Sequence, residues 1–166
     1  IEGAAVLAGE ATDRLGKVEG RVLAEAQAAL QQPGISLVDA ALLASELGAK
    51  ALHDPTEGGL AGGLYEMAAA AAVGIRVDPN AVLWFEPGLA VCEALGCDPW
   101  STLASGTLLA AFASEEAHSA LAVLAEAGHP AAAIGLVEAG DGVYDVGGVV
   151  LPRPGRDEVA RLLGNG

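Results

Sequence analysis

The sequence predicts an α/β or α+β domain with one mixed sheet. Apolar residues at helical spacing alternate with short apolar runs typical of strands, and glycine or proline separates most of them. Because the two kinds of segment alternate, the helices are expected to cover the sheet. A length of 166 residues suits one domain, 1–166, which can bury roughly 70% of its unfolded surface. The order of the strands is left open.

The first third of the chain is predicted to be mainly helical. The second predicted helix stops at "QQPG", and the third can be capped by Ser36 and ends at Gly48. The run "AKALH" is a buried strand before a polar turn. The predicted helices are 3–15, 22–30 and 36–47.

The rest of the chain alternates more regularly. One helix follows Thr56 and ends at Gly74, and another covers 86–95 and is closed by Gly96. Asp98 is expected to cap a short helix with Pro99 at its first position, and Ser114 to cap a longer one. A last helix covers 156–163. The predicted strands are "IRV", "GTLLAAF", "AAAIGLVEA" and "GVVLP", with "DPN" and "GDG" as turns, the second of them hairpin-like.

Composition limits the function classes. The apolar fraction is 52% but the aromatic fraction only 4%, so close contacts between elements must build the core. A net charge of −14 argues against nucleic acid or an anionic membrane as partner. No apolar run approaches the roughly 20 residues that span a bilayer, and nothing resembles a signal peptide. A cytoplasmic location is therefore the expectation.

The stretch "HDPTEGGLAGG" is the most informative motif, because glycine costs about 1 kcal/mol against alanine inside a helix. Pro55 biases Asp54 toward an extended conformation, and Thr56 is well suited to cap the helix that follows. The backbone N–H groups at the helix start would then be free to bind an anion such as phosphate. These are the N–H groups of Glu57, Gly58 and Gly59.

A simpler interpretation of the same turn is an ordinary corner between a strand and a helix. Glu57 favours this interpretation, because its charge would repel a phosphate unless it turns away or shares a metal. In that case Gly59→Ala changes stability by about 1 kcal/mol or less. Gly62 and Gly63 are assigned to close helix packing under both interpretations.

Three segments together resemble the C-terminal domain of the aminoimidazole ribonucleotide (AIR) synthase superfamily. They are "IEGAAVLA", "LGAKALHDPTEGGLAGGLYEMAAAAAVGIRV" and "EALGCDPWSTLASGTLLAAF". The resemblance covers nearly the whole chain in register, and the most similar branch is the hydrogenase expression/formation protein E type (HypE) with its AIR-synthase-related relatives.

This resemblance implies a three-layer α/β/α domain that belongs to an ATP-dependent protein, which places a phosphate on an amide-type oxygen or another nucleophile. It implies an N-terminal domain, absent from this chain, that forms the dimer and supplies most contacts to ATP and Mg²⁺. The isolated chain is then expected to be inactive, mostly monomeric and at best a millimolar nucleotide binder. Asp54, Thr56, Gly58 and Gly59 would face the cleft, with Ser105 and Gly106 as contacts from a second loop.

Two departures from the family keep a second function class open. HypE members end in a tail with a terminal cysteine, whereas no cysteine follows Cys97 here, and they often carry arginine where this chain has Glu57. The chain is therefore either the substrate-side part of an enzyme or a binding module that kept the fold. The module could serve metalloenzyme maturation, and the expected partners are the N-terminal domain and a maturation protein.

The remaining candidates are a histidine and two cysteines. His53 could act as a general base oriented by Asp54, although a half-buried structural role is the alternative. Cys92 falls on the apolar side of its helix, and Cys97 at a helix start has no basic neighbour in sequence to activate it. No metal site is predicted, because the cysteines lack a matching ligand cluster.

Overall fold

The computed structural model describes residues 1–164 and confirms the α/β class. The first part contains α1 (Glu2–Glu10), α2 (Gly20–Ala28), α3 (Val38–Glu46), β1 (Ala51–His53), α4 (Gly59–Ala71) and β2 (Gly74–Val77). The second part contains α5 (Glu86–Leu95), β3 (Leu109–Ala111), α6 (Ser114–Glu126), β4 (Gly135–Glu138), β5 (Val143–Asp145) and α7 (Glu158–Leu163). Helices and strands alternate from α3 to β4, as the sequence pattern predicts.

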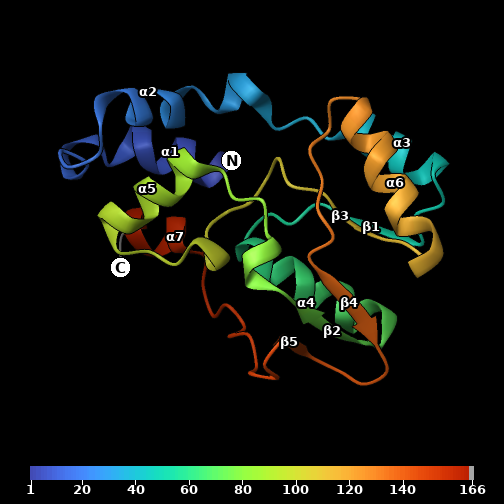
Figure 1. Ribbon diagram of the computed structural model, residues 1–166. Helices are drawn as coiled ribbons and strands as arrows, with labels where there is room; N and C mark the ends of the chain where they lie inside the picture. The colour runs from blue at the N-terminus through green and yellow to red at the C-terminus, as the bar shows by residue number, and fades with distance from the viewer. Residues whose placement is uncertain (165–166) are drawn as a thin grey trace.

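The strands form two short sheets. The mixed sheet has the order β4-β2-β5, with β2 antiparallel to β4 and parallel to β5. The other sheet is the antiparallel pair β1-β3, which the sequence did not separate from the first. Helix α4 contacts strands of both sheets, so it lies at the centre of the arrangement (Figure 1).

The end of the mixed sheet differs from the sequence prediction. The predicted strand "GVVLP" at 148–152 makes only an isolated antiparallel bridge, between Val150 and Tyr144, and the strand β5 precedes it. The "GDG" turn closes no hairpin, because β4 and β5 both pair with β2 and lie on its two sides. The central position of β2 therefore overrides the local hairpin signal.

Helix ends follow the sequence signals unevenly. Asp98 caps the 3₁₀ helix Pro99–Ser101 as predicted, accepting a hydrogen bond from the Trp100 N–H at 3.1 Å. The caps predicted at Ser36, Thr56 and Ser114 are wrong. Leu37, Gly58 and Ala113 precede the three helices, and none makes a side-chain capping bond.

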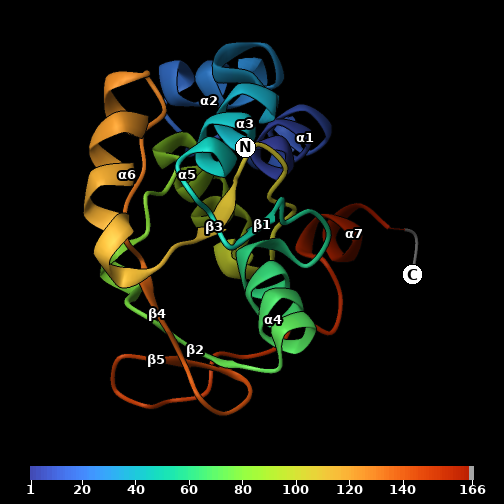
Figure 2. The same ribbon diagram turned by 90° about the vertical axis from the view of Figure 1, so that its right-hand side faces the viewer.

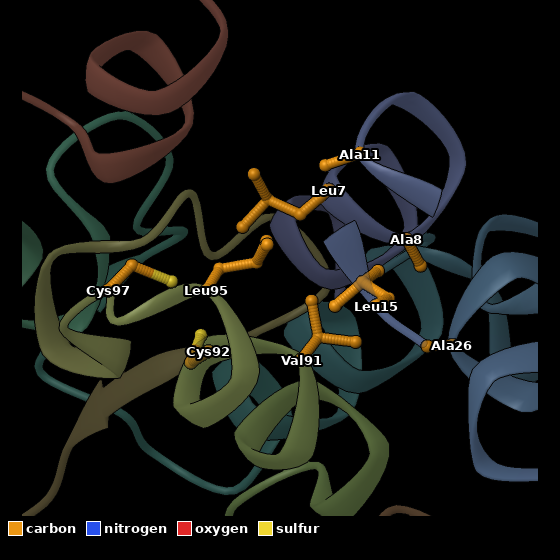
Figure 3. Close-up of a cluster of buried hydrophobic side chains, with 9 residues drawn as sticks. All are labelled: Leu7, Ala8, Ala11, Leu15, Ala26, Val91, Cys92, Leu95 and Cys97. Carbon is orange, nitrogen blue, oxygen red and sulfur yellow. The ribbon is translucent and has the colours of Figure 1, made fainter. Parts of the chain in front are cut away.

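Two clusters of buried side chains make the core. The helical core joins α1, α2 and α5, and α7 packs against it (Figure 3). The sheet core lies between α4 and the two sheets. The helical core comprises Leu7, Ala8, Ala11, Leu15, Ala26, Val91, Cys92, Leu95 and Cys97. The sheet core comprises Leu60, Leu64, Ala68, Ile75, Val77, Leu109 and Val143.

The outer part of the mixed sheet exposes large apolar side chains. Leu136 and Val137 on β4 are both exposed, and so are the apolar residues that follow β5. Figure 2 shows this sheet at the end of the molecule away from α1 and α2. We call this set the apolar rim: Leu136, Val137, Val146, Val149 and Val150. No helix within residues 1–164 is both long and apolar enough for a transmembrane span.

Candidate functional site

The turn between β1 and α4 explains its glycine pair through backbone conformation. Gly58 has a φ of 79° and Gly59 a φ of 65°, both in the left-handed region that residues with a Cβ rarely adopt. Gly58 immediately precedes the first residue of α4. The chain uses glycine here because it enters the helix through two consecutive left-handed residues.

Gly59 is also where a second segment approaches the turn. A Cβ on Gly59 would lie 2.5 Å from the Trp100 carbonyl oxygen and 2.7 Å from that of Thr102. The expectation of a change of about 1 kcal/mol or less for Gly59→Ala assumed an ordinary helical position, and Gly59 has a left-handed backbone beside two carbonyl oxygens, so a larger loss is expected.

A hydrogen bond joins the two predicted loops. The Ala104 N–H donates to the Thr56 carbonyl oxygen at 3.2 Å, which brings the segment before Ser105 and Gly106 beside the turn. The Ser105 carbonyl accepts from the Glu2 N–H at 3.2 Å, and Gly106 lies against Ile1. The second loop is thereby held between the turn and the start of α1.

A carboxylate from the far end of the chain already binds the turn. Asp157 Oδ2 accepts from the Gly58 N–H at 2.9 Å, and its Oδ1 accepts from the Val159 N–H at 2.8 Å (both distances N to O). Asp157 is only 8% exposed. The Gly59 N–H donates to the Thr56 carbonyl at 3.0 Å, so the expectation that both glycine N–H groups are free is wrong.

Sequence reasoning missed Asp157 at the turn, although part of its role was readable. An aspartate directly before a helix is a standard N-cap signal, and Asp157 caps α7 in this way. Its bond to Gly58 spans 99 positions, and no local pattern encodes a contact of that range.

The turn as arranged does not fit a phosphate at Gly58, since Asp157 holds that N–H group. A phosphate could bind there only after Asp157 withdrew, and it would then meet the exposed carboxylate of Glu57. For Mg²⁺, no group of three or more His, Cys, Asp or Glu ligands gathers within residues 1–164. The turn therefore does bind an anion, and that anion is the Asp157 carboxylate of the same chain.

His53 has a different partner from the one predicted. Its Nε2 lies 2.7 Å from Oε2 of Glu66 on α4, so Glu66 rather than Asp54 orients the ring. The side chain of His53 is half-buried, at one end of a groove of about 350 Å³. Ile35, Leu37, Val38, Ala41, Leu52, Asp54 and Leu108 complete the lining of this groove.

The second glycine pair behaves largely as predicted. A Cβ on Gly63 would lie 2.5 Å from Pro55 Cβ and 3.2 Å from His53 Cδ2, which confirms close packing of α4 on the β1 segment. A Cβ on Gly62 would meet only the Glu57 carbonyl, at 3.2 Å. Gly63 therefore brings α4 close enough for the His53–Glu66 contact.

The fold and the two joined loops define an α/β domain of the AIR synthase type. The sequence matches the family "AIR synthase related protein, C-terminal domain" over residues 1–147, and the chain belongs to this family.

Several relatives and solved structures that resemble this chain are HypE proteins. A carbamoyl dehydratase HypE of Rhizobium leguminosarum bv. viciae is 39% identical over 97 residues, which is 56% of this chain and 27% of the relative. The crystal structure of E. coli HypE, a hydrogenase maturation protein, matches with a TM-score of 0.66 and 31% identity. That match covers 76% of this chain and 42% of the E. coli chain.

A structure of the hydrogenase maturation protein HypE in complex with ATP also matches, with a TM-score of 0.58 and 31% identity. It covers 69% of this chain and 38% of that protein. The chain thus spans less than half the length of each of these proteins.

Proposed function

We propose that this chain is the substrate-side domain of an ATP-dependent protein related to HypE. The parent protein would activate an amide-type oxygen or a similar nucleophile by phosphoryl transfer, and the isolated domain would be inactive. Family membership supports the proposal, as do the carbamoyl dehydratase name of one relative and the ATP complex of another. ATP and Mg²⁺ would be held mainly by an N-terminal domain of the parent.

The observation that carries the proposal is the hydrogen bond between the two loops. Because the Ala104 N–H donates to the Thr56 carbonyl, the β1–α4 turn and the loop before β3 lie side by side. The proposed substrate-side contacts in these two loops are Asp54, Thr56, Gly58, Gly59, Ser105 and Gly106.

The chemistry assigned to this domain is positioning. Backbone N–H groups at the start of α4 favour a negative charge, and the Asp157 carboxylate already bound there supports this preference. His53 Nε2 lies 2.7 Å from Glu66 Oε2 beside the same turn, and His53 is the candidate acid or base of this domain.

One observation favours the alternative, a module that keeps the fold without catalysis. Asp157 is buried and bonds both Gly58 and Val159, so the turn is closed by a contact that stabilises the domain itself. Such a module would bind a metalloenzyme-maturation protein in the cytoplasm.

The test begins with the natural gene upstream of this sequence. The enzyme proposal expects an upstream domain with an Asp-rich metal motif, and ATP turnover by the joined protein. In that protein, Thr56→Ala should lower turnover by tenfold or more, while the exposed Ser119→Ala, far from the turn in sequence, should leave it unchanged. If Thr56→Ala left turnover unchanged, the turn would have no part in the proposed activity.

Calorimetry on the 166-residue chain alone provides an independent arm. The proposal expects no nucleotide binding at micromolar ATP, because the chain by itself presents the Asp157-closed turn. Micromolar affinity in the isolated chain would contradict the division of labour between the two domains.

A further inference from the structure

The two cysteines of the chain meet at the end of α5. The Cys97 N–H donates to the Cys92 carbonyl at 3.0 Å, and the Gly96 N–H donates to the Glu93 carbonyl at 3.3 Å. With Gly96 left-handed at a φ of 64°, these two bonds form a Schellman motif. In such a motif the side chains at the positions of Cys92 and Cys97 frequently pack together, and here both are thiols in one buried cluster.

The contact lies at one edge of the helical core. Cys92 is 4% exposed and Cys97 is 9% exposed, and Figure 3 shows both beside Leu95. The Thr102 hydroxyl donates to the Asp98 carbonyl at 2.7 Å and lies 3.7 Å from Cys92 Sγ.

The environment makes the two thiols unequal. The pKa of Cys92 is lowered, chiefly by its interaction with the Cys97 side chain, while burial opposes this shift. The pKa of Cys97 is raised strongly, first by the interaction with Cys92 and then by burial. Cys92 is thus the more easily formed thiolate, and a thiolate is the nucleophilic form of cysteine.

We propose that Cys92 and Cys97 form a dithiol site that a hydroperoxide converts to an intramolecular disulfide. The Cys92 thiolate attacks the terminal peroxide oxygen, which breaks the O–O bond and gives a sulfenic acid and, with hydrogen peroxide, water. The Cys97 sulfur then attacks the sulfenic sulfur, the S–S bond forms, and a second water leaves. Two thiols are oxidised as one peroxide is reduced, and the two thiol protons end in the two waters.

Helix α7 controls access to this site. Its apolar residues Val159, Leu162 and Leu163 pack against the helical core. Polar contacts fix it to the turn that carries Cys97. Glu158 Oε2 accepts from the Asp98 N–H at 3.3 Å, and Arg161 Nη2 donates to the Gly96 carbonyl at 3.3 Å. Because α7 has only six residues, its local opening costs less than global unfolding.

The experiment treats the native 166-residue chain with hydrogen peroxide and then alkylates all free thiols in denaturant. Cleavage after Glu93 by a glutamate-specific protease separates Cys92 from Cys97, so the two peptides stay joined only if the disulfide is present. The expected result is one linked peptide pair, two hydrogen masses below the sum, and released by a reductant. Two alkylated thiols after treatment, or disulfides only between chains, would overturn the proposal.

Two single variants test the assignment of roles. In Cys97→Ser the sulfenic acid on Cys92 cannot be resolved, so dimedone should label Cys92. In Cys92→Ser the labelling of Cys97 should be at least tenfold weaker than that of Cys92 in Cys97→Ser, and equal labelling of the two variants would contradict the assignment of Cys92 as the attacking thiol. Arg161→Met should speed disulfide formation severalfold by loosening α7. An unchanged rate would exclude α7 as the cover.

Discussion

The helical core and the sheet core differ in how completely each is enclosed by this chain. In the helical core, three helices and α7 surround Leu7, Leu15 and Val91, and each of these side chains has no exposed surface. In the sheet core, α4 covers β2 on one side, while β4 at the sheet edge leaves Leu136 and Val137 largely exposed. The helical core buries its apolar surface within this chain, whereas the sheet region leaves part of its apolar surface exposed to solvent.

This difference indicates where the chain has apolar surface left for another protein segment. A core that is closed by its own helices depends only on its own packing, whereas a sheet with an apolar rim has surface left for another protein segment. The proposed site lies between these regions, because the turn before α4 contacts Trp100, Thr102 and Asp157. We call this turn, with its contacts to Trp100, Thr102 and Asp157, the seam, because it joins the two regions.

The largest effect is expected at the seam, from Gly59→Ala. The new Cβ would overlap the carbonyl oxygens of Trp100 and Thr102 at a residue whose φ is positive. Left-handed strain and backbone displacement together predict a loss of about 4 kcal/mol in the free energy of unfolding. A denaturant melt measures this loss.

Gly62→Ala is the matched control within the same helix. Its φ is not positive, and the nearest atom to a new Cβ is the Glu57 carbonyl oxygen at 3.2 Å. Its unfolding free energy should change by about 1 kcal/mol or less. If Gly59→Ala and Gly62→Ala lowered the unfolding free energy equally, helix propensity rather than the contacts at the seam would explain the loss.

The next effect is expected inside the helical core, from Leu7→Ala. Leu7 has no exposed surface, so truncation leaves a cavity among Val91, Leu95 and Leu15. A loss of about 3 kcal/mol is expected. Leu42→Ala on α3 is the control, since Leu42 is 60% exposed and should change stability by about 0.5 kcal/mol or less. If Leu7→Ala left the unfolding free energy nearly unchanged, the helical core would not be closed.

The sequence predicted the elements better than their ends and partners. Periodicity located α5 and β2 because each carries its own apolar pattern and a glycine at a boundary. It placed the last strand wrongly, because "GVVLP" has strand composition but β2 already pairs with Val143–Asp145. The choice between two suitable segments depends on pairing, and no local pattern reports that.

The candidate site shows the same limit more sharply. The turn and the second loop were found from residue types and from a family resemblance, and their adjacency depends on one backbone hydrogen bond between Ala104 and Thr56. Asp157 and Glu66 were missed, because each contact joins residues far apart in sequence and neither follows from a motif. Gly58 and Gly59 were singled out from the sequence, but the main reason for glycine at these positions is their left-handed backbone conformation.

A smaller loss is expected when the seam is weakened at Asp157. Asp157→Asn keeps the shape of the side chain but removes its charge, and only its one carbonyl oxygen can still accept a hydrogen bond from Gly58 or Val159. The unfolding free energy should fall by about 1–2 kcal/mol. Amide exchange in α7 should quicken, while exchange in α1 follows only the global stability.

Asp141→Asn provides the control for Asp157→Asn, because Asp141 is exposed in the loop between β4 and β5. It should leave both the melt and the amide exchange unchanged. If α7 exchanged at the wild-type rate in Asp157→Asn, the carboxylate would not be what attaches α7 to the turn.

The smallest effect on stability is expected at the apolar rim, where Leu136→Ser changes a side chain that is 67% exposed. The free energy of unfolding should change by about 0.5 kcal/mol or less, because little apolar burial is lost within the chain.

Self-association of the chain should instead decrease in this variant. The chain is expected to be mostly monomeric when dilute, and any weak association at high concentration in sedimentation experiments should decrease in Leu136→Ser. Leu42→Ser, which changes an equally apolar exposed position on α3, separates the rim from general surface hydrophobicity. If Leu136→Ser destabilised the monomer as much as Leu7→Ala does, the rim would be part of a closed core, and the contrast between the two regions would fail.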